Sequence, residues 1–416
     1  MEIGKRKMKI AVIGAGISGL SFAKYCKIYR KDWEVKVFES LSSHGGIAKV
    51  KMIDGIPFHM VGGHCFNSKF QDVKDFVFEH VLPESEWNKV DRNASILFEG
   101  QKISYPIEYS IKDIYKYNPK LATSIIKDFI SAKRESADNL GDWFINNFGK
   151  TLAEKYFIPY NTKIWNCDPF KMSADWVSDK LPMPNLEEFI KGFFESGKDL
   201  MPHASFYYPK SGTQNTFIDQ LAANLEITYN TSIGSIKMKK NGTVEINGDV
   251  YDKVIYTGPL DRVFDLVENV TEEVTSAARS LKFNRVTTVL WESEDTEDTW
   301  TYSPASDLLF HRLIHIGNFV GSKKNYTITE AVGEQSYQDM IDSGAKLDML
   351  RKPLDYNISE RAYVVFDKDI NANKKIIFDY FESSNIHLLG RFGEWEYYNM
   401  DICIKKAMEL CEILGK

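Results

Sequence analysis

The 416-residue chain is poor in cysteine and has no excess of positive charge. Its cysteines do not form the close pairs or spacings of a metal site or a disulfide framework, and we expect no metal. They are Cys26, Cys65, Cys167, Cys403 and Cys411. This distribution is typical of a reducing compartment. The net charge of −6 argues against a nucleic-acid-binding protein, since such proteins need a basic surface.

Long apolar runs are also missing. No stretch approaches the roughly 20 apolar residues that span a bilayer, so we expect no membrane span. The basic beginning, MEIGKRKMKI, precedes a glycine-broken apolar run without a cleavage site, which is not the pattern of a signal peptide. We therefore expect a cytoplasmic protein. Hydrophobic residues make up 43%, enough for the two or three domains that this length predicts.

A glycine motif near the N-terminus predicts a dinucleotide-binding site. The segment KIAVIGAGISGLSFAKYC combines a short apolar strand, a glycine turn and a helix. Gly14 allows the tight turn, Gly16 lets the backbone approach a pyrophosphate, and Gly19 lets the helix pack on the strand. The helix N-terminus offers free N–H groups to the phosphates. A second strand ends at Glu39, about 20 residues after Gly19, where an acid meets a ribose hydroxyl.

A second pair of glycines, Gly45 and Gly46, favours FAD over NAD as the dinucleotide. FAD enzymes of the amine-oxidase type commonly carry such a pair, where the backbone passes close to the cofactor, and the chain resembles that superfamily here. A third pair, Gly62 and Gly63, follows a predicted strand. These glycines would let the backbone of His64 approach a flavin or a sugar. The alternative is that His64 is an ordinary loop histidine.

The order of patterns predicts an α/β protein whose domains are interleaved in the sequence. Apolar spacing of three and four begins at about Ile111 and indicates an inserted set of helices. Asn241-Gly242 and Asn247-Gly248 predict two β-hairpins. We expect a Rossmann-type FAD-binding domain from residues 1–100, 201–280 and 381–416, a helical domain at 101–200, and an antiparallel β-sheet substrate domain at 281–380.

Large aromatic side chains and arginines stand out in three segments. FIPYNTKIW brings Tyr160, Lys163 and Trp165 close together, FHRLIH contains Arg312, and GRFGEWEYYNMD contains Arg391 among several rings. Spacing alone leaves two interpretations open. The rings could be core residues at helix ends and the arginines could form surface ion pairs, or both could line a substrate pocket.

A series of short motifs follows a specific order along nearly the whole chain. They are GAGISG, GGHCF, ISYPIE, FIPYNTKIW, FYYPKSGTQNTF, VIYTGPLD, FHRLIH and GRFGEWEYYNMD. This set resembles the UDP-galactopyranose mutases and their close relatives. The resemblance implies an enzyme that interconverts the pyranose and furanose rings of a nucleotide-linked sugar. It also implies FAD in its reduced form, whose nitrogen N5 attacks the anomeric carbon while the nucleoside diphosphate leaves.

The resemblance also implies roles for individual residues. Arg312 and Arg391 match arginines that hold the diphosphate, and His64 matches a histidine close to the flavin, so we predict these three as catalytic. Predicted substrate contacts are Tyr160, Trp165, Lys180, Tyr363, Tyr397 and Asn399. Predicted cofactor contacts are Gly14, Gly16, Gly19, Glu39, Gly45, Gly46, Gly62, Gly63, Gly390, Met400 and Asp401.

Two positions depart from the family pattern. Lys180 stands nearest to the place where bacterial mutases carry an arginine, and Asn399 stands where an acid is expected. The sugar and nucleotide therefore stay open between UDP-galactose and an N-acetylated or deoxy sugar on UDP or dTDP. The family also suggests a homodimer. Two alternatives remain: an FAD oxidoreductase of the amine-oxidase or desaturase type, and a relative that binds FAD without catalysis.

Overall fold

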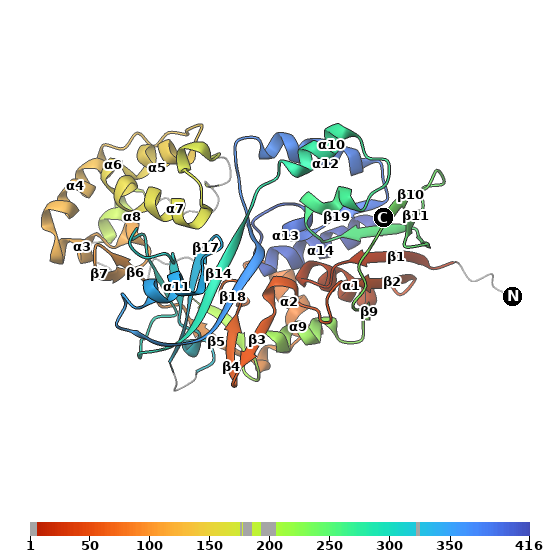
Figure 1. Ribbon diagram of the computed structural model, residues 1–416, viewed down its shortest axis with the longest axis horizontal. Coiled ribbons are helices and arrows are strands. Elements are labelled where there is room, and N and C mark those ends of the chain that lie inside the picture. The colour runs from red at the N-terminus through yellow and green to blue at the C-terminus, as the bar shows by residue number, and fades with distance from the viewer. Residues whose placement is uncertain (1–5, 175–176, 178–184, 193–204, 322–324) are drawn as a thin grey trace.

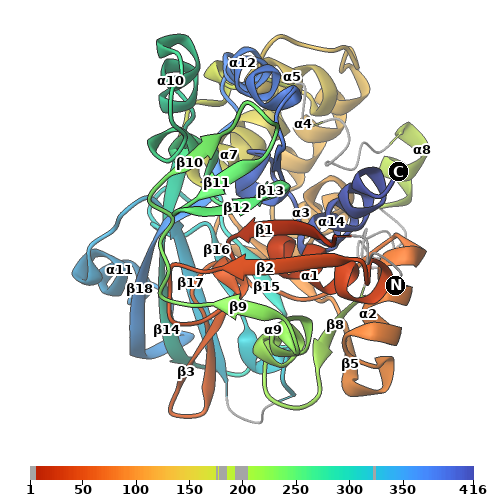
Figure 2. The same ribbon diagram turned by 90° about the vertical axis from the view of Figure 1, so that its right-hand side faces the viewer.

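The computed structural model describes residues 6–174, 177, 185–192, 205–321 and 325–416. A five-stranded parallel sheet lies beside the N-terminus. Its strands are, in spatial order, β19 (Ile386–Leu388), β13 (Lys253–Tyr256), β1 (Met8–Ile13), β2 (Trp33–Phe38) and β9 (Glu226–Thr228). The chain returns to this sheet at VIYTGPLD, because β13 pairs with β1. Strands far apart in the sequence thus build one Rossmann-type sheet (Figure 2).

Helices and short strands surround this sheet. The helices are α1 (Ile17–Tyr29), α2 (Gln71–His80), α9 (Gln214–Ala222), α13 (Gly390–Gly393) and α14 (Met400–Leu414). The short strands are β3 (Val50–Ile53) paired with β4 (Ile56–His59), β5 (Trp87–Asp91) paired with β8 (Ser205–Pro209), and β10 (Ile236–Met238), β11 (Val244–Ile246) and β12 (Asp249–Tyr251). Both predicted hairpins are present between β10, β11 and β12. Asn247 and Gly248 both have positive φ, as a tight two-residue hairpin turn requires.

A group of helices occupies one end of the molecule (Figure 1). They are α3 (Ile111–Tyr117), α4 (Pro119–Ile130), α5 (Leu140–Phe148), α6 (Lys150–Leu152), α7 (Ile158–Trp165) and α8 (Leu186–Lys191). A π-helical turn, Ala153–Phe157, joins α6 to α7. The π-turn shifts the register of the helix just before Tyr160, and such bulges frequently occur at functional sites.

A seven-stranded sheet lies between these helices and the Rossmann-type sheet (Figure 1). Its strands are, in order, β18 (Leu350–Val364), β14 (Phe283–Ser293), β17 (Tyr326–Val332), β16 (Arg312–Ile314), β15 (Trp300–Tyr302), β6 (Ala94–Phe98) and β7 (Gln101–Ser104). All neighbours are antiparallel except β15 and β6. Its helix α11 (Tyr337–Gly344) packs near β18.

The domain boundary expected at residue 100 differs from the observed topology. It separates β6 from β7, although both strands form one hairpin in the seven-stranded sheet. The pattern of a short hairpin reports alternating burial but not which sheet the hairpin joins. The segment expected to form only the antiparallel sheet also ends in a helix, α12 (Ile370–Glu382), which packs against α10 (Glu272–Arg279). Among the described residues, no helix has the length and apolarity of a bilayer-crossing segment.

Candidate active site

The turn between β1 and α1 has no room for a side chain at Gly14 or Gly19. Gly14 has φ +103, and a Cβ there would lie 2.4 Å from the hydroxyl oxygen of Thr257. A Cβ on Gly19 would lie 2.1 Å from the carbonyl oxygen of Gly14. Gly16 is the N-cap of α1, and no side chain caps this helix. The first N–H groups of α1 are therefore available to a phosphate that approaches along the backbone.

The second glycine pair crosses directly over this turn. The Gly45 N–H donates to the carbonyl of Ala15 at 2.8 Å. A Cβ on Gly46 would lie 3.2 Å from the Cα of Gly16, and Gly46 has φ +56, so glycine is favoured at this position. Glu39, at the end of β2, accepts hydrogen bonds from the N–H groups of Ala15 and Leu41 at 2.9 Å each. Glu39 therefore holds the turn in shape, in addition to the ribose contact predicted for it.

The C-terminal segment closes the same region. Gly390 has φ +85, and a Cβ there would lie 2.0 Å from the hydroxyl oxygen of Ser18 in the first turn of α1. Met400 begins α14, and its sulfur accepts a hydrogen bond from Gln214 at 3.6 Å. The glycine cradle, defined here as Gly14–Gly19, Gly45, Gly46 and Gly390, fits a dinucleotide whose phosphates lie against backbone N–H groups.

Arg391 follows the cradle immediately and is held by neutral groups. Its Nη2 donates to the carbonyl of Ala362 at 2.8 Å, and its Nη1 donates to the carbonyl of Tyr398 at 3.1 Å. The guanidinium carbon lies 4.5 Å from the ring centre of Tyr397 and 5.5 Å from that of Tyr363. Within the described ranges Arg391 has no carboxylate ion pair, and its buried Nε has no hydrogen-bond partner. The result is a positioned cation whose charge is not neutralised.

Arg312 has the opposite surroundings. Its Nη2 lies 2.7 Å from an oxygen of Glu330, to which its Nε also donates at 2.9 Å. The hydroxyl of Tyr363 donates to the same oxygen and accepts from Arg312, at 2.8 Å in both cases. Glu330 is fully buried. Burial alone would raise the pKa of Glu330, but the Arg312 charge and hydrogen bonds from His311 and Tyr363 outweigh it and lower that pKa. The Arg312 charge is therefore compensated within the protein.

Glu330 was not predicted as a site residue. It lies in β17, whose residues Tyr326–Val332 are all buried, within the range 281–380 expected to form the antiparallel sheet. A single acid inside a continuous buried strand is unusual without a partner, since carboxylates are almost never fully buried unless paired. That pattern was the available signal. It could not reveal that the partner would be Arg312.

Three aromatic rings converge beside the arginines. Tyr363 and Tyr397 stack with ring centres 5.8 Å apart. Trp165 meets both rings edge-on, at 6.3 and 5.7 Å. Tyr160 lies near the same group, 6.0 Å from Tyr302 and 6.3 Å from His311. These rings come from α7, β15, β18 and the segment before α14, so the group forms only in the folded protein.

His64 also belongs to this group. Burial and the nearby charge of Arg391 lower the pKa of His64 to about 4, although Glu330 opposes this effect. Its Nε2 is buried without a hydrogen-bond partner. The Nδ1 of His59 accepts a hydrogen bond from the His64 backbone N–H at 3.2 Å. His64 is therefore neutral at physiological pH, and one of its ring nitrogens has no hydrogen-bond partner among the described residues.

The structure brings together His64, Arg312, Arg391, Tyr160, Trp165, Tyr363 and Tyr397, which we call the arginine–aromatic cluster. Lys180 lies outside the described residues. Asn399 is exposed as the N-cap of α14, and its side chain makes no capping hydrogen bond. Lys163 lies near Tyr160, but it donates to three backbone carbonyls, those of Ser303, Ala305 and Phe310, at 2.8 to 3.0 Å. Lys163 thus ties α7 to the segment before Arg312.

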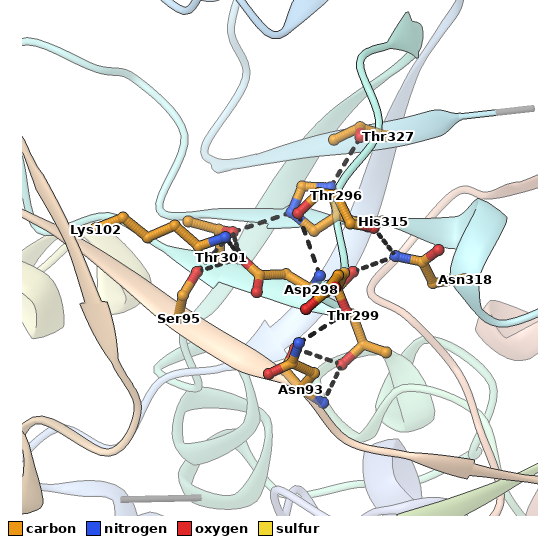
Figure 3. A network of polar contacts seen from close by, with 11 residues as sticks. Asn93, Ser95, Lys102, Thr296, Asp298, Thr299, Thr301, His315, Asn318 and Thr327 are labelled. Atoms are coloured by element: carbon orange, nitrogen blue, oxygen red, sulfur yellow. Dashed lines mark hydrogen bonds and ion pairs between the residues drawn. The ribbon is translucent and has the colours of Figure 1, made fainter. Parts of the chain in front are cut away.

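A buried polar network anchors the strands that carry Tyr302 and Arg312 (Figure 3). His315 lies 3.0 Å from the hydroxyl of Thr301 and 2.9 Å from that of Thr327. Ser95 donates to Asp298 at 2.6 Å, and Lys102 pairs with the same carboxylate at 2.7 Å. Burial lowers the pKa of His315 to about 4. The network joins β6, β7, β15, β17 and the residue after β16 through hydrogen bonds and one ion pair.

Comparison with known proteins supports the dinucleotide site and the resemblance. A family model described as an NAD(P)-binding Rossmann-like domain matches residues 12–79. The dTDP-fucopyranose mutase of Escherichia coli is 22% identical over 98% of both chains. The UDP-galactopyranose mutase of Mycoplasma genitalium is 23% identical over 96% of this chain and 94% of its own.

A solved structure of reduced UDP-galactopyranose mutase has the same fold, with a TM-score of 0.84 and 22% identity over 98% of this chain and 94% of its own. The predicted fold class is therefore confirmed: an α/β protein with a Rossmann-like dinucleotide-binding part and antiparallel sheets. The predicted resemblance to the UDP-galactopyranose mutases is confirmed as well, at low identity but over nearly the whole chain.

Proposed function

We propose that this protein is a flavin-dependent mutase that interconverts the pyranose and furanose forms of a nucleoside-diphosphate sugar. The curated relatives with full-length similarity are nucleotide-sugar mutases. The observation that carries the proposal is the position of Arg391. This uncompensated cation follows Gly390 of the cradle directly and stacks on Tyr397, so it joins the dinucleotide site to the aromatic pocket.

The cofactor that fits best is FAD, needed in its reduced form. The cradle accommodates a dinucleotide, and its crossing of Gly46 over Gly16 fits the second glycine pair of flavin enzymes. When bound and reduced, FAD would supply the nucleophilic nitrogen N5 for the anomeric carbon of the sugar. All other requirements of the reaction fall on side chains of this chain.

The first requirement is to hold a nucleoside diphosphate that leaves and must return. Arg391 and Arg312 provide guanidinium groups, which bind phosphate oxygens with two parallel hydrogen bonds. Arg391 brings a full positive charge. Arg312 brings directed N–H donors while Glu330 offsets its charge. The stacked rings of Tyr363 and Tyr397 keep both guanidinium groups in place and exclude water from the leaving group.

The second requirement is to guide the sugar during ring opening and closure. His64 is neutral and has a free Nε2 in this pocket. A neutral imidazole can accept a hydrogen bond from a sugar hydroxyl without adding a third positive charge. We propose that His64 orients the sugar, and that Trp165 and Tyr160 close the pocket on the side of α7.

An FAD oxidoreductase of the amine-oxidase or desaturase type would use the same glycine cradle. Such an enzyme does not require a cation such as Arg391 beside the cofactor site. A non-catalytic flavoprotein would likewise not require it. The arginine–aromatic cluster is therefore the feature that favours a mutase, and the departures at Lys180 and Asn399 leave the sugar open.

A trapping experiment tests the proposal. The purified protein would be reduced with dithionite, mixed with a panel of UDP- and dTDP-sugars, and quenched with cyanoborohydride, and the released flavin would be weighed. A flavin whose mass has increased by that of one sugar would support the mutase and identify the sugar. Unmodified FAD across the panel, together with oxygen consumption on an amine, would favour the oxidoreductase instead.

A further inference from the structure

A third arginine, Arg92, lies beside the arginine–aromatic cluster and is not explained by the roles above. It connects β5 to β6, and its Nη2 donates to the hydroxyl of Tyr302 at 2.7 Å. Its guanidinium carbon lies 5.1 Å from the ring centre of Trp300 and 5.5 Å from that of Tyr105. Its Nε is buried without a hydrogen-bond partner. No carboxylate of the described chain forms an ion pair with Arg92.

Arg92 is linked to the cluster through Tyr302. Tyr302, its hydrogen-bond partner, is paired with Arg312 across β15 and β16, and it also contacts Tyr160. Cys65, the neighbour of His64, is close to both arginines. Burial raises the pKa of Cys65 to about 12, and the charges of Arg92 and Arg312 oppose that rise. Arg92 and Arg312 therefore share two neighbours, Tyr302 and Cys65.

The charges of this region do not balance within the part of the chain that the structure describes. Glu330 offsets Arg312. The pKa values of His64 and His311 are lowered, mainly by burial, so neither imidazole is charged at neutral pH. Among the described residues, Arg391 and Arg92, both half-buried, are left as two positive charges without a carboxylate partner. A buried charge without a counter-ion is costly, and the aromatic rings compensate it only in part.

We propose that Arg92 is a third anion-binding arginine of this site, and that Arg92 and Arg391 together balance the diphosphate of the nucleotide sugar. This inference rests on the proposed function. A diphosphate esterified at both ends carries two negative charges, which equals the charge left uncompensated by the protein. The alternative is that Arg92 only packs between Trp300 and Tyr105, in which case it would stabilise the fold without affecting diphosphate affinity.

The experiment measures the affinity of the FAD-loaded protein for UDP and for UDP-galactose, with dTDP and a dTDP-sugar in parallel. The Arg92→Met variant keeps the length of the side chain and removes the charge. We expect it to weaken binding of the free diphosphate and of the sugar conjugate alike, by about tenfold or more. Arg92→Lys keeps the charge but loses the planar guanidinium that can bind phosphate with two hydrogen bonds, so a smaller, few-fold loss of affinity is expected.

Arg134→Met is the matched control, because Arg134 also stacks on a ring, that of Phe129, but in the helical part of the chain. It should leave every affinity unchanged. Bound flavin and the melting temperature report whether each variant is folded. If Arg92→Met does not retain flavin, the diphosphate affinity of Arg92→Lys is used instead, and the expected few-fold loss tests the inference.

Two results would overturn the inference about Arg92. One is an unchanged diphosphate affinity in a folded variant, Arg92→Met or, where that variant loses flavin, Arg92→Lys. The other is a loss confined to the sugar conjugate, with UDP and dTDP unaffected, which would place Arg92 at the sugar. Failure of the parent protein to bind any of these nucleotides is a different outcome, because it would remove the proposed function itself.

Discussion

The glycine cradle and the arginine–aromatic cluster adjoin each other, yet one needs positions without side chains and the other needs large, closely packed side chains. In the cradle, two chain segments cross where a single Cβ would collide with backbone or a hydroxyl group. In the cluster, large rings and arginines from separate elements pack against one another, and the Nε of Arg391 and the Nε2 of His64 are buried among them. The cradle depends on the absence of side chains at glycine positions that the sequence itself displays. The cluster depends on compensation between distant side chains.

The cluster itself contains an instructive pair. Arg312 and Arg391 both contact Tyr363, but only Arg312 has a carboxylate partner within the part of the chain that the structure describes. An arginine paired with a carboxylate can still donate directed hydrogen bonds. An arginine without such a partner also attracts anions through its net charge. The following substitutions separate these roles and separate the cradle from the cluster.

The largest effect is expected in the cradle. Gly14→Val should abolish FAD binding, because its side chain would collide with Thr257 at a positive φ. The measurement is the flavin content of the purified protein. Gly100→Ala is the control, since Gly100 also has positive φ but no atom within 4 Å of the added Cβ. A yellow Gly14→Val protein would contradict the assignment.

Glu330→Gln should cause the next largest change. It keeps the shape of the side chain but leaves the Arg312 charge without its counter-ion, so the free energy of unfolding should fall by roughly 3 kcal/mol. Affinity for UDP should hold or rise, because Arg312 then offers an uncompensated charge. Denaturant titration and calorimetry measure the two effects. Glu294→Gln, in an exposed ion pair with Arg351, is the control and should change stability little. Weaker UDP binding at unchanged stability would show that Glu330 does not have this role.

Arg391→Ala should lower the affinity for the nucleotide sugar by about tenfold or more, since it removes an uncompensated charge and its hydrogen bonds. FAD should stay bound, because the cradle itself is intact. Arg351→Ala, at an exposed arginine, serves as the control. An unchanged dissociation constant in a flavin-loaded Arg391→Ala protein would show that Arg391 does not bind the nucleotide sugar.

The smallest effect concerns pH and belongs to the buried histidines near the cluster. Burial lowers the pKa of His59 to about 3, with His64 contributing, and that of His315 to about 4. The folded state keeps these rings neutral while the unfolded chain takes up protons below its pKa of about 6.5. Their contribution to stability is therefore fully present above that pH and is lost as the pH falls. Between pH 7 and 5.5 each should cost about 1 kcal/mol.

Denaturant titrations at pH 7, 6 and 5.5 measure this slope. His315→Asn removes one of the titrating groups, so its stability should depend less steeply on pH than that of the parent, whatever its stability at pH 7. An equal slope in both proteins would mean that His315 takes up its proton as readily in the folded state as in the unfolded chain.

Several parts of the site could be predicted because their cause is local. The strand–glycine–helix order around Gly14, the end of β2 at Glu39 and the Asn-Gly hairpins all depend on neighbouring residues. The aromatic and arginine positions were accessible only through ordered motifs. Glu330 and Arg92 were missed, because a buried acid and a loop arginine gain meaning only from partners far along the chain.

The sequence by itself determined the backbone of the dinucleotide site, since glycine spacing and strand-to-helix periodicity act over a few residues. Tertiary structure decided which sheet received β6 and β7, which arginine was neutralised and which histidines stayed uncharged. These outcomes depend on burial and on charges brought within a few ångströms of each other. Both conditions arise only when segments separated by hundreds of residues pack together.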